Sequence, residues 1–98
     1  MNTKKEFQKV VAAIRADARK EDPKAEYPKA MMTGQQAANG TATINCGRGA
    51  DSSRSMAQAI LKDERFKKFM HDAIVDDAYV EQVVEGRITR YQVRVNFA

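Results

Sequence analysis

The sequence predicts a small α+β domain whose elements follow the order helix, hairpin, bent helix, hairpin. Two periodicities support this prediction. Apolar residues recur at helical spacing in residues 3–22 and 51–73, and they alternate with polar residues in residues 41–46 and 76–97. We expect about four mostly antiparallel strands with the helices packed on one face, because this arrangement buries every apolar stripe.

The length and charge of the chain limit what it can be. Its 98 residues predict one domain, residues 1–98, because a second core would have too few apolar residues to offset the entropy of ordering its chain. Seventeen Lys and Arg against thirteen Asp and Glu give a net charge of +4, spread without a polybasic tail. This balance permits weak binding to nucleic acid or acidic partners, and it is equally typical of an ordinary solvated surface.

Cysteine usage and hydropathy predict a cytoplasmic location. Cys46 is the single cysteine and cannot form an internal disulfide, and the start MNTKKEF lacks the apolar stretch of a secretory signal. No apolar run approaches the roughly 20 residues that cross a bilayer, so the sequence predicts no membrane span.

The first helix is predicted over residues 3–22. Pro23 disfavours helical geometry in the residue before it, so the helix ends by Asp22. Its apolar stripe consists of Phe7, Val10, Val11, Ile14 and Ala18. The opposite side, which we interpret as a solvated face, carries Lys5, Lys9, Arg15, Arg19 and Glu21.

The first hairpin is predicted after a connecting loop. Residues 21–30 contain two prolines and no periodicity, which indicates a loop. The dipeptide Asn39-Gly40 is a favoured centre of a two-residue hairpin turn, since both positions tolerate positive φ. We expect the outgoing strand near residues 31–38, although its Gln and Ala residues favour helix as readily as strand. The returning strand is predicted to bury Ala42, Ile44 and Cys46.

Residues 51–73 are predicted to form two helical pieces. Asp51 or Ser52 caps the first piece, and Asp63 caps the second. We expect a bend near Lys62, because the two apolar stripes do not line up on one cylinder. The first stripe consists of Met56, Ala59 and Ile60, and the second of Phe66, Phe69, Met70 and Ala73.

The C-terminal segment DDAYVEQVVEG fits either a helix ended by Gly86 or the first arm of a hairpin. We predict the hairpin, because pairing across a Glu85-Gly86 turn yields an apolar face and an ion pair between Glu81 and Arg90 in one register. That register also pairs Val84 with Arg87, Gln82 with Thr89, Val80 with Tyr91, Ala78 with Val93, Val83 with Ile88, and Tyr79 with Gln92.

The stretch INCGRGADSSRS, residues 44–55, has two interpretations. A strand, a glycine turn and a helix start could hold an anion on free backbone amides, with Arg48 or Arg54 closing over it. The Walker phosphate-binding pattern is absent, and Asp51 places a negative charge where the anion would lie. We therefore interpret the stretch as a turn and a helix cap, with an auxiliary anion contact as the alternative.

The sequence predicts no enzyme, no metal and no cofactor. A cysteine phosphatase loop would need an arginine six residues after Cys46, where Ser52 stands. A catalytic set of Cys46, His71 and Asp72 would need distant segments to meet, whereas the strand alternation buries Cys46 as an inert thiol. One cysteine and one histidine do not make a zinc site.

Two groups of cations suggest a binding surface. The strand RITRYQVRVNF places polar and cationic side chains on one face, where an open sheet could follow a phosphate backbone while Tyr79 stacks on a base. The simpler interpretation is a solvated face on which Glu81 engages Arg90. The residues predicted to contact nucleic acid or a partner are Arg48, Arg54, Lys62, Arg65, Lys67, Lys68, Tyr79, Arg90, Gln92 and Arg94.

The sequence therefore predicts a small non-enzymatic binding module. The first hypothesis is that it contacts nucleic acid through the cationic sheet face and the basic helix cluster. The alternative is a protein–protein interaction module, such as an adaptor or inhibitor encoded by a mobile element, that binds an acidic or nucleic-acid-handling protein. Two copies of the chain could also pair through an uncovered edge strand and form a homodimer.

Overall fold

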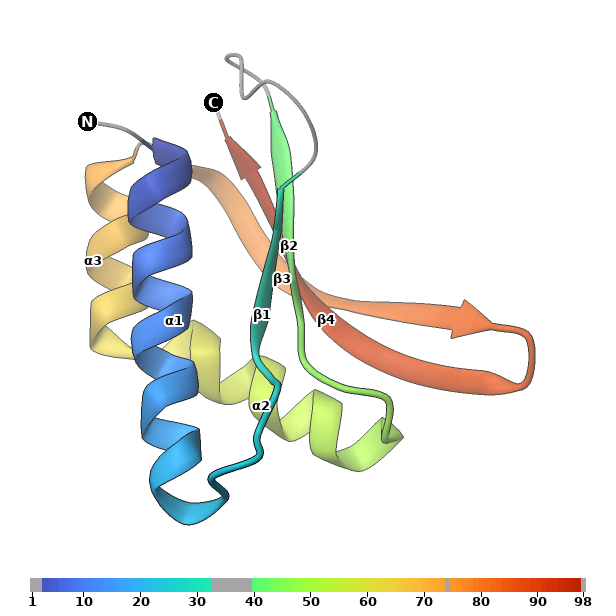
Figure 1. The fold of residues 1–98 in the computed structure, drawn as a ribbon. Helices are drawn as coiled ribbons and strands as arrows, with labels where there is room; N and C mark the ends of the chain where they lie inside the picture. The colour runs from blue at the N-terminus through green and yellow to red at the C-terminus, as the bar shows by residue number, and fades with distance from the viewer. Residues whose placement is uncertain (1–2, 33–39, 74, 98) are drawn as a thin grey trace.

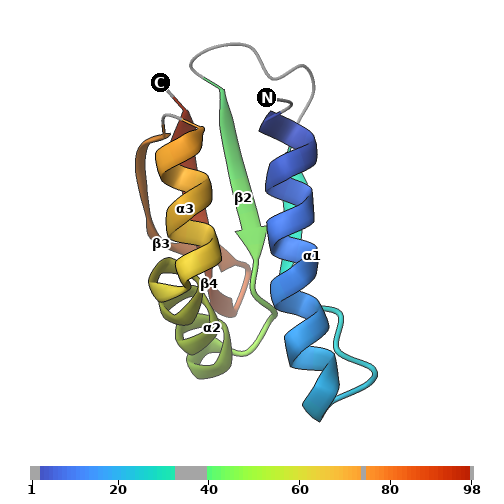
Figure 2. The same cartoon turned by 90° about the vertical axis from the view of Figure 1, so that its left-hand side faces the viewer.

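The computed structural model describes residues 3–32, 40–73 and 75–97 of the chain. The described residues form three helices and a four-stranded antiparallel sheet, which confirms the predicted α+β class (Figure 1). The elements are α1 (Thr3–Glu21), β1 (Lys29–Met32), β2 (Thr41–Asn45), α2 (Ala50–Lys62), α3 (Glu64–Asp72), β3 (Val75–Glu85) and β4 (Ile88–Phe97). The strand order is β1-β2-β4-β3, and the helices lie on one face of the sheet (Figure 2).

The apolar stripe of α1 forms as the periodicity predicts. Phe7, Val11 and Ile14 are buried, and Val10 packs at the edge of the core. After α1 the chain turns at residues 22–27 and enters β1 through a cis peptide bond between Tyr27 and Pro28.

The two central helices meet at the predicted bend. Asp63 ends α2 with extended backbone, and its carboxylate accepts hydrogen bonds from the backbone N–H groups of Arg65 at 2.8 Å and Phe66 at 3.3 Å, so it caps α3. The predicted capping of α2 by Asp51 or Ser52 is wrong. Its N-cap is Gly49, so both side chains lie in the first helical turn.

The buried face of α2 also differs from the prediction, because a serine occupies one of its core positions. Ala57 and Ile60 are buried, whereas Ala59 is exposed. Ser53 completes the stripe: its hydroxyl donates to the carbonyl oxygen of Ala50 and accepts the backbone N–H of Tyr91 at 2.9 Å. A buried hydroxyl with both partners is tolerated in a core, and it interrupts the apolar pattern from which a helix face is predicted.

The first hairpin forms, but its predicted register is wrong. A two-residue turn at Asn39-Gly40 would place Gln35 opposite Ile44, whereas Ala30 is observed opposite Ile44. Asn39 itself lies outside the described residues. The outgoing strand begins directly after Pro28 rather than near residue 31. The observed register matches apolar residues with each other, since Met32 also lies opposite Ala42.

The second hairpin is confirmed, with a register shifted by two residues. Glu85 pairs with Ile88, so the turn lies at Gly86 and Arg87 rather than at Glu85 and Gly86. Gly86 has a φ of 61°, which suits the first position of such a turn. A shift of two residues keeps every side chain on its predicted face, but it moves Glu81 away from Arg90 and opposite Gln92.

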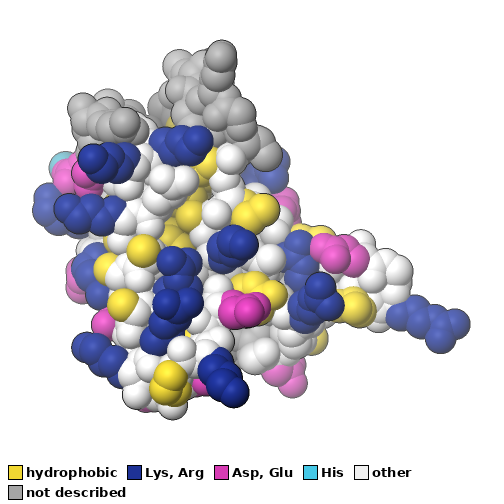
Figure 3. Space-filling view, in the orientation of Figure 1, with side chains coloured by type: hydrophobic (Ala, Val, Ile, Leu, Met, Phe, Trp, Pro, Cys, Tyr) yellow, Lys and Arg dark blue, Asp and Glu magenta, His cyan; other side chains and the backbone are white. Residues whose placement is uncertain are grey.

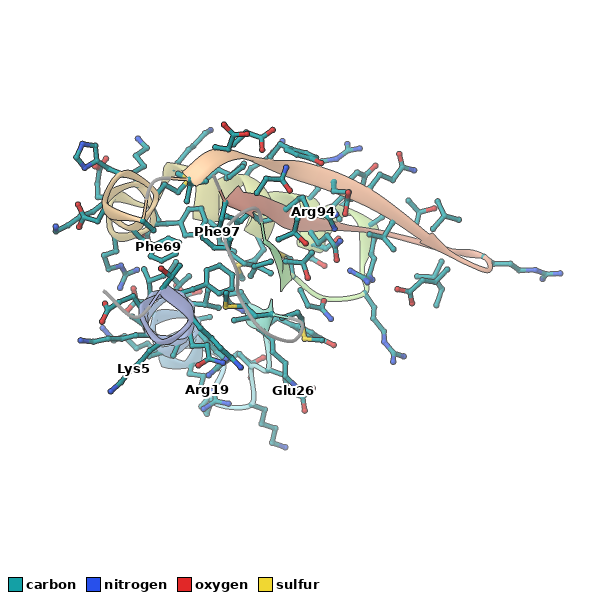
Figure 4. All side chains as sticks on the ribbon, turned by 90° about the horizontal axis from the view of Figure 1, so that it is seen from above. Lys5, Arg19, Glu26, Phe69, Arg94 and Phe97 are labelled. Atoms are coloured by element: carbon teal, nitrogen blue, oxygen red, sulfur yellow. The ribbon has the colours of Figure 1, made fainter. Side chains whose placement is uncertain are left out.

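The core lies between the helices and the sheet and has an aromatic cluster at one end. Phe69 of α3 lies with its ring centroid 5.6 Å from Phe7, 6.0 Å from Phe66 and 6.3 Å from Phe97. Figure 4 shows Phe69 and Phe97 between α3 and the sheet, with Arg94 on the other side of β4. Ring pairs at these separations stabilise a core beyond their burial alone. The cluster thus joins α1 and α3 to β4.

Among the helices in residues 3–32, 40–73 and 75–97, none combines the length and the apolar character that a membrane-spanning helix needs.

Candidate nucleic-acid interface

The cationic strip predicted on β4 is largely neutralised. Arg90 donates to Oε1 of Glu85 from Nε at 3.1 Å and from Nη2 at 2.8 Å, and its Nη1 donates to Oε1 of Gln92 at 3.1 Å. Its side chain is only 14% exposed. The predicted pair of Arg90 with Glu81 is wrong, because the shifted register brings Glu85 to Arg90 instead.

The other predicted residues of the open sheet face have acidic neighbours or are buried. Gln92 is buried, and its amide donates to Oε1 of Glu81 at 2.7 Å. Nη1 of Arg94 lies 4.0 Å from the same carboxylate oxygen, and its side chain is one-third exposed. Tyr79 lies opposite Arg94 and is 42% exposed. This face therefore offers an exposed aromatic ring, but its two arginines are paired with acidic residues of β3.

The basic cluster predicted on the helices is also paired. Arg65 lies between Asp17 at 2.7 Å and Asp63 at 2.8 Å; hydrogen bonds to these carboxylates raise the pKa of Arg65, and Arg65 lowers the pKa of both carboxyl groups. Lys68 lies 2.7 Å from Asp72, whose carboxylate raises the lysine pKa, and Lys67 lies 3.6 Å from Glu64. Lys62 is exposed and makes no ion pair with any described residue.

Arg48 and Arg54, the two arginines of residues 44–55, have different contacts. The guanidinium of Arg54 stacks over the ring of Tyr91, 4.2 Å from its centroid, and hydrogen-bonds to its hydroxyl. Arg48 is exposed and has no ion-pair or hydrogen-bond partner within the described part of the chain. The structure therefore leaves Arg48, but not Arg54, free to meet a ligand.

Cys46 has the surroundings of a core thiol, as its strand position predicts. It is buried, its Sγ donates to the carbonyl oxygen of Ile44 at 3.4 Å, and burial raises its pKa to about 12. A thiol with this pKa carries almost no thiolate at neutral pH, so it is a poor nucleophile. His71 is exposed on α3 beside Asp72, with Nδ1 3.3 Å from that carboxylate.

Four cations without acidic partners among the described residues lie around β1. Figure 3 shows Lys and Arg side chains over α1 and beside the adjoining strands. Two hollows of about 490 and 280 Å³ lie here, and both are lined by Tyr27 and Asn45. Five cations line them; Arg90 is paired with Glu85, and none of the other four forms an ion pair with a described residue. We call these four residues the basic surface: Arg15, Arg19, Lys29 and Arg48.

The loop after α1 orients two of these side chains. Nη1 of Arg15 donates to the carbonyl oxygen of Pro28 at 3.1 Å, and Nε of Arg19 donates to that of Ala25 at 2.8 Å. Arg19 and Glu26 lie on the same side of the molecule (Figure 4). A guanidinium has five N–H donors, so each arginine keeps most of them for a ligand while these bonds hold its position.

Sequence reasoning missed three members of this surface. The sequence predicts a solvated face for Arg15 and Arg19 and a loop for Lys29; of the four residues, only Arg48 is among the predicted contacts. One signal was present: Arg15 has no acidic residue three or four positions away along its helix, so the helix itself cannot neutralise it. The proximity of Lys29 and Arg48 depends on the path of the loop and on the strand pairing.

Comparisons with known proteins add no functional information. No family model, curated protein or solved structure matches the chain. In the part of the chain that the structure describes, no three His, Cys, Asp or Glu side chains are grouped so that they could hold a metal ion.

Proposed function

We propose that this protein is a small non-enzymatic module that binds nucleic acid through the basic surface. The single observation that carries the proposal is the contrast between two sets of cations. Arg15, Arg19, Lys29 and Arg48 line adjoining hollows and have no acidic partner in the described residues, whereas Arg65, Lys68 and Arg90 each have at least one.

The two sets of cations differ in the free-energy cost of contacting a phosphate group. A paired cation that contacts phosphate must either leave its carboxylate or bring that negative charge close to the phosphate, so its net attraction is weaker. An unpaired cation gives up only water and counterions, and the release of counterions from the nucleic acid favours the complex. The predicted sheet face and helix cluster are therefore replaced by the basic surface in this proposal.

The chemistry of the basic surface suits a phosphate backbone. Three of its members are arginines, whose planar guanidinium groups can bind phosphate oxygens in a bidentate manner. The bonds of Arg15 and Arg19 to loop carbonyls reduce the side-chain entropy that binding would cost. Glu26 and Glu85 also line the hollows, and Glu85 is paired with Arg90.

Fluorescence anisotropy of labelled DNA and RNA, single- and double-stranded, tests the proposal across a range of salt concentrations. We expect micromolar or tighter binding at low salt, with the logarithm of the binding constant falling linearly with the logarithm of salt concentration. If all four cations contact phosphate, the slope for a single strand is about −3. No binding to any of these nucleic acids at low salt would refute the proposal.

A second candidate function rests on β3. This strand has eleven residues and lies at one edge of the sheet, where it pairs with β4 and with no other described strand, and Tyr79 and Val84 on it are exposed. An extended segment of a protein partner, or β3 of a second copy, could add a strand there. This candidate predicts a complex that persists at physiological salt, and light scattering after gel filtration distinguishes a homodimer from a complex with another protein.

A further inference from the structure

Tyr27 lies where the hollows of the basic surface meet. Its side chain lines the hollows of about 490 and 280 Å³ and also a third one of about 560 Å³ beside the start of α2. It comes from the loop that receives the hydrogen bonds of Arg15 and Arg19. The ring therefore lies beside all four cations of the basic surface, and the carboxylates of Glu26 and Glu85 also line these hollows, with Glu21 and Asp22 lining the third.

The ring of Tyr27 is held in place by its neighbours. A Cβ at Gly47 would lie 3.4 Å from Cδ2 of Tyr27, so the ring packs against the backbone of this glycine. Gly47 has a φ of 109°, a conformation that other residues rarely adopt, so few side chains could replace it. The ring is half-buried. It is thus a pre-positioned surface rather than a freely rotating side chain, which lowers the entropy cost of stacking on it.

Polar groups able to contact a base lie beside the ring. Oδ1 of Asn45 accepts the backbone N–H of Gly47 at 3.0 Å, which fixes the amide orientation. Its Nδ2 donates to no described residue. The hollow of about 280 Å³ also contains donors on Arg48 and the carboxylate of Glu85. A nucleobase needs this combination of an aromatic face with donors and an acceptor at its edge.

We propose that the ligand is a single-stranded nucleic acid, with one base stacked on Tyr27 and neighbouring phosphates bound by the basic surface. This inference rests on the proposed function. In a duplex both faces of each internal base are covered by stacking, so only an unpaired base can reach the ring. Stacking accepts every base, so a sequence preference should arise only at the stacked position, from the edge contacts of Asn45, Arg48 and Glu85.

Substitutions of Tyr27 test the inference in the same anisotropy assay. Tyr27→Leu should weaken single-strand binding about 10-fold and leave duplex binding and the salt slope unchanged, because stacking is lost while the phosphate contacts remain. Tyr27→Phe should retain the wild-type affinity. The matched control is Tyr79→Leu, which removes the exposed tyrosine of the open sheet face and should change nothing.

Tyrosine fluorescence supplies a readout that does not depend on the leucine variant folding well. The chain has three tyrosines and no tryptophan. Saturation with a single strand should quench the wild-type emission, and most of that quenching should disappear in Tyr27→Phe. Equal quenching in both proteins would place the stacked base elsewhere and overturn the inference.

The outcomes separate the two proposals. If the wild type binds no nucleic acid, both the proposed function and the stacking inference are refuted. If it binds single strands and duplexes equally and Tyr27→Leu weakens neither, the stacking inference is overturned while the proposed function stands. A preference for single strands that Tyr27→Leu abolishes supports both.

Discussion

Replacement of Phe69 by alanine is expected to lower the free energy of unfolding by about 3–5 kcal/mol. The side chain is buried and its ring lies against Phe7, Phe66 and Phe97, so alanine leaves a cavity where α1, α3 and β4 meet. A domain of this size is stable by about 5–15 kcal/mol, so the variant should unfold at much lower urea concentrations.

Two further variants control this result. Phe69→Leu fills most of the cavity and should lose clearly less stability than the alanine variant. Met31→Ala changes an exposed side chain and should stay within about 0.5 kcal/mol of the wild type. A loss below about 1 kcal/mol for Phe69→Ala would mean that the aromatic cluster does not hold these elements together.

Removal of the basic surface is expected to reduce nucleic-acid binding by at least about 100-fold at physiological salt. The variant carries Gln at Arg15, Arg19, Lys29 and Arg48. Each lost cation removes one phosphate contact and the counterion release that accompanies it, so the salt slope should also fall toward zero. Anisotropy with a labelled single strand measures both changes. Thermal unfolding of the same protein reports any effect of losing the Arg15 and Arg19 bonds to the loop.

A charge-matched variant separates this surface from the total charge of the protein. It carries Gln at four exposed cations that make no ion pair within the described ranges: Lys4, Lys9, Lys62 and Arg87. Its net charge equals that of the first variant, so it should keep the wild-type affinity within a few-fold. Equal losses in the two variants would indicate binding through overall charge instead of a defined site.

Most of the fold follows from rules that involve only residues close together in the sequence. The stripe of Phe7, Val11 and Ile14 needs only helical spacing, and the cap at Asp63 needs only its own carboxylate and the backbone amides two and three residues later. The strand register is harder to predict, because it depends on contacts between segments. Ala30 pairs with Ile44 because both are apolar, and no turn motif in the sequence signals that pairing.

The candidate site was harder to predict, because the sequence gives the number of charged residues but not which of them form ion pairs in the fold. Arg65 is one of the contacts that the sequence predicts, yet Asp17, 48 residues earlier, lies 2.7 Å from it once α1 packs beside α3. Arg90 acquires Glu85 only through the observed hairpin register. Arg15 and Arg19 instead donate to carbonyl oxygens of the loop after α1, and neither forms an ion pair with a described residue, although Glu26 of that loop lines the same hollow.

The most direct test of the central claim is a map of where nucleic acid binds, obtained by titrating ¹⁵N-labelled protein with an unlabelled single strand at low salt and following the backbone amide shifts. The account predicts that the largest shifts fall in residues 15–29 and 45–48, which carry the basic surface and Tyr27. Shifts concentrated instead in residues 62–72 of the helix cluster, or in the open sheet face at residues 77–81 and 92–96, would contradict it.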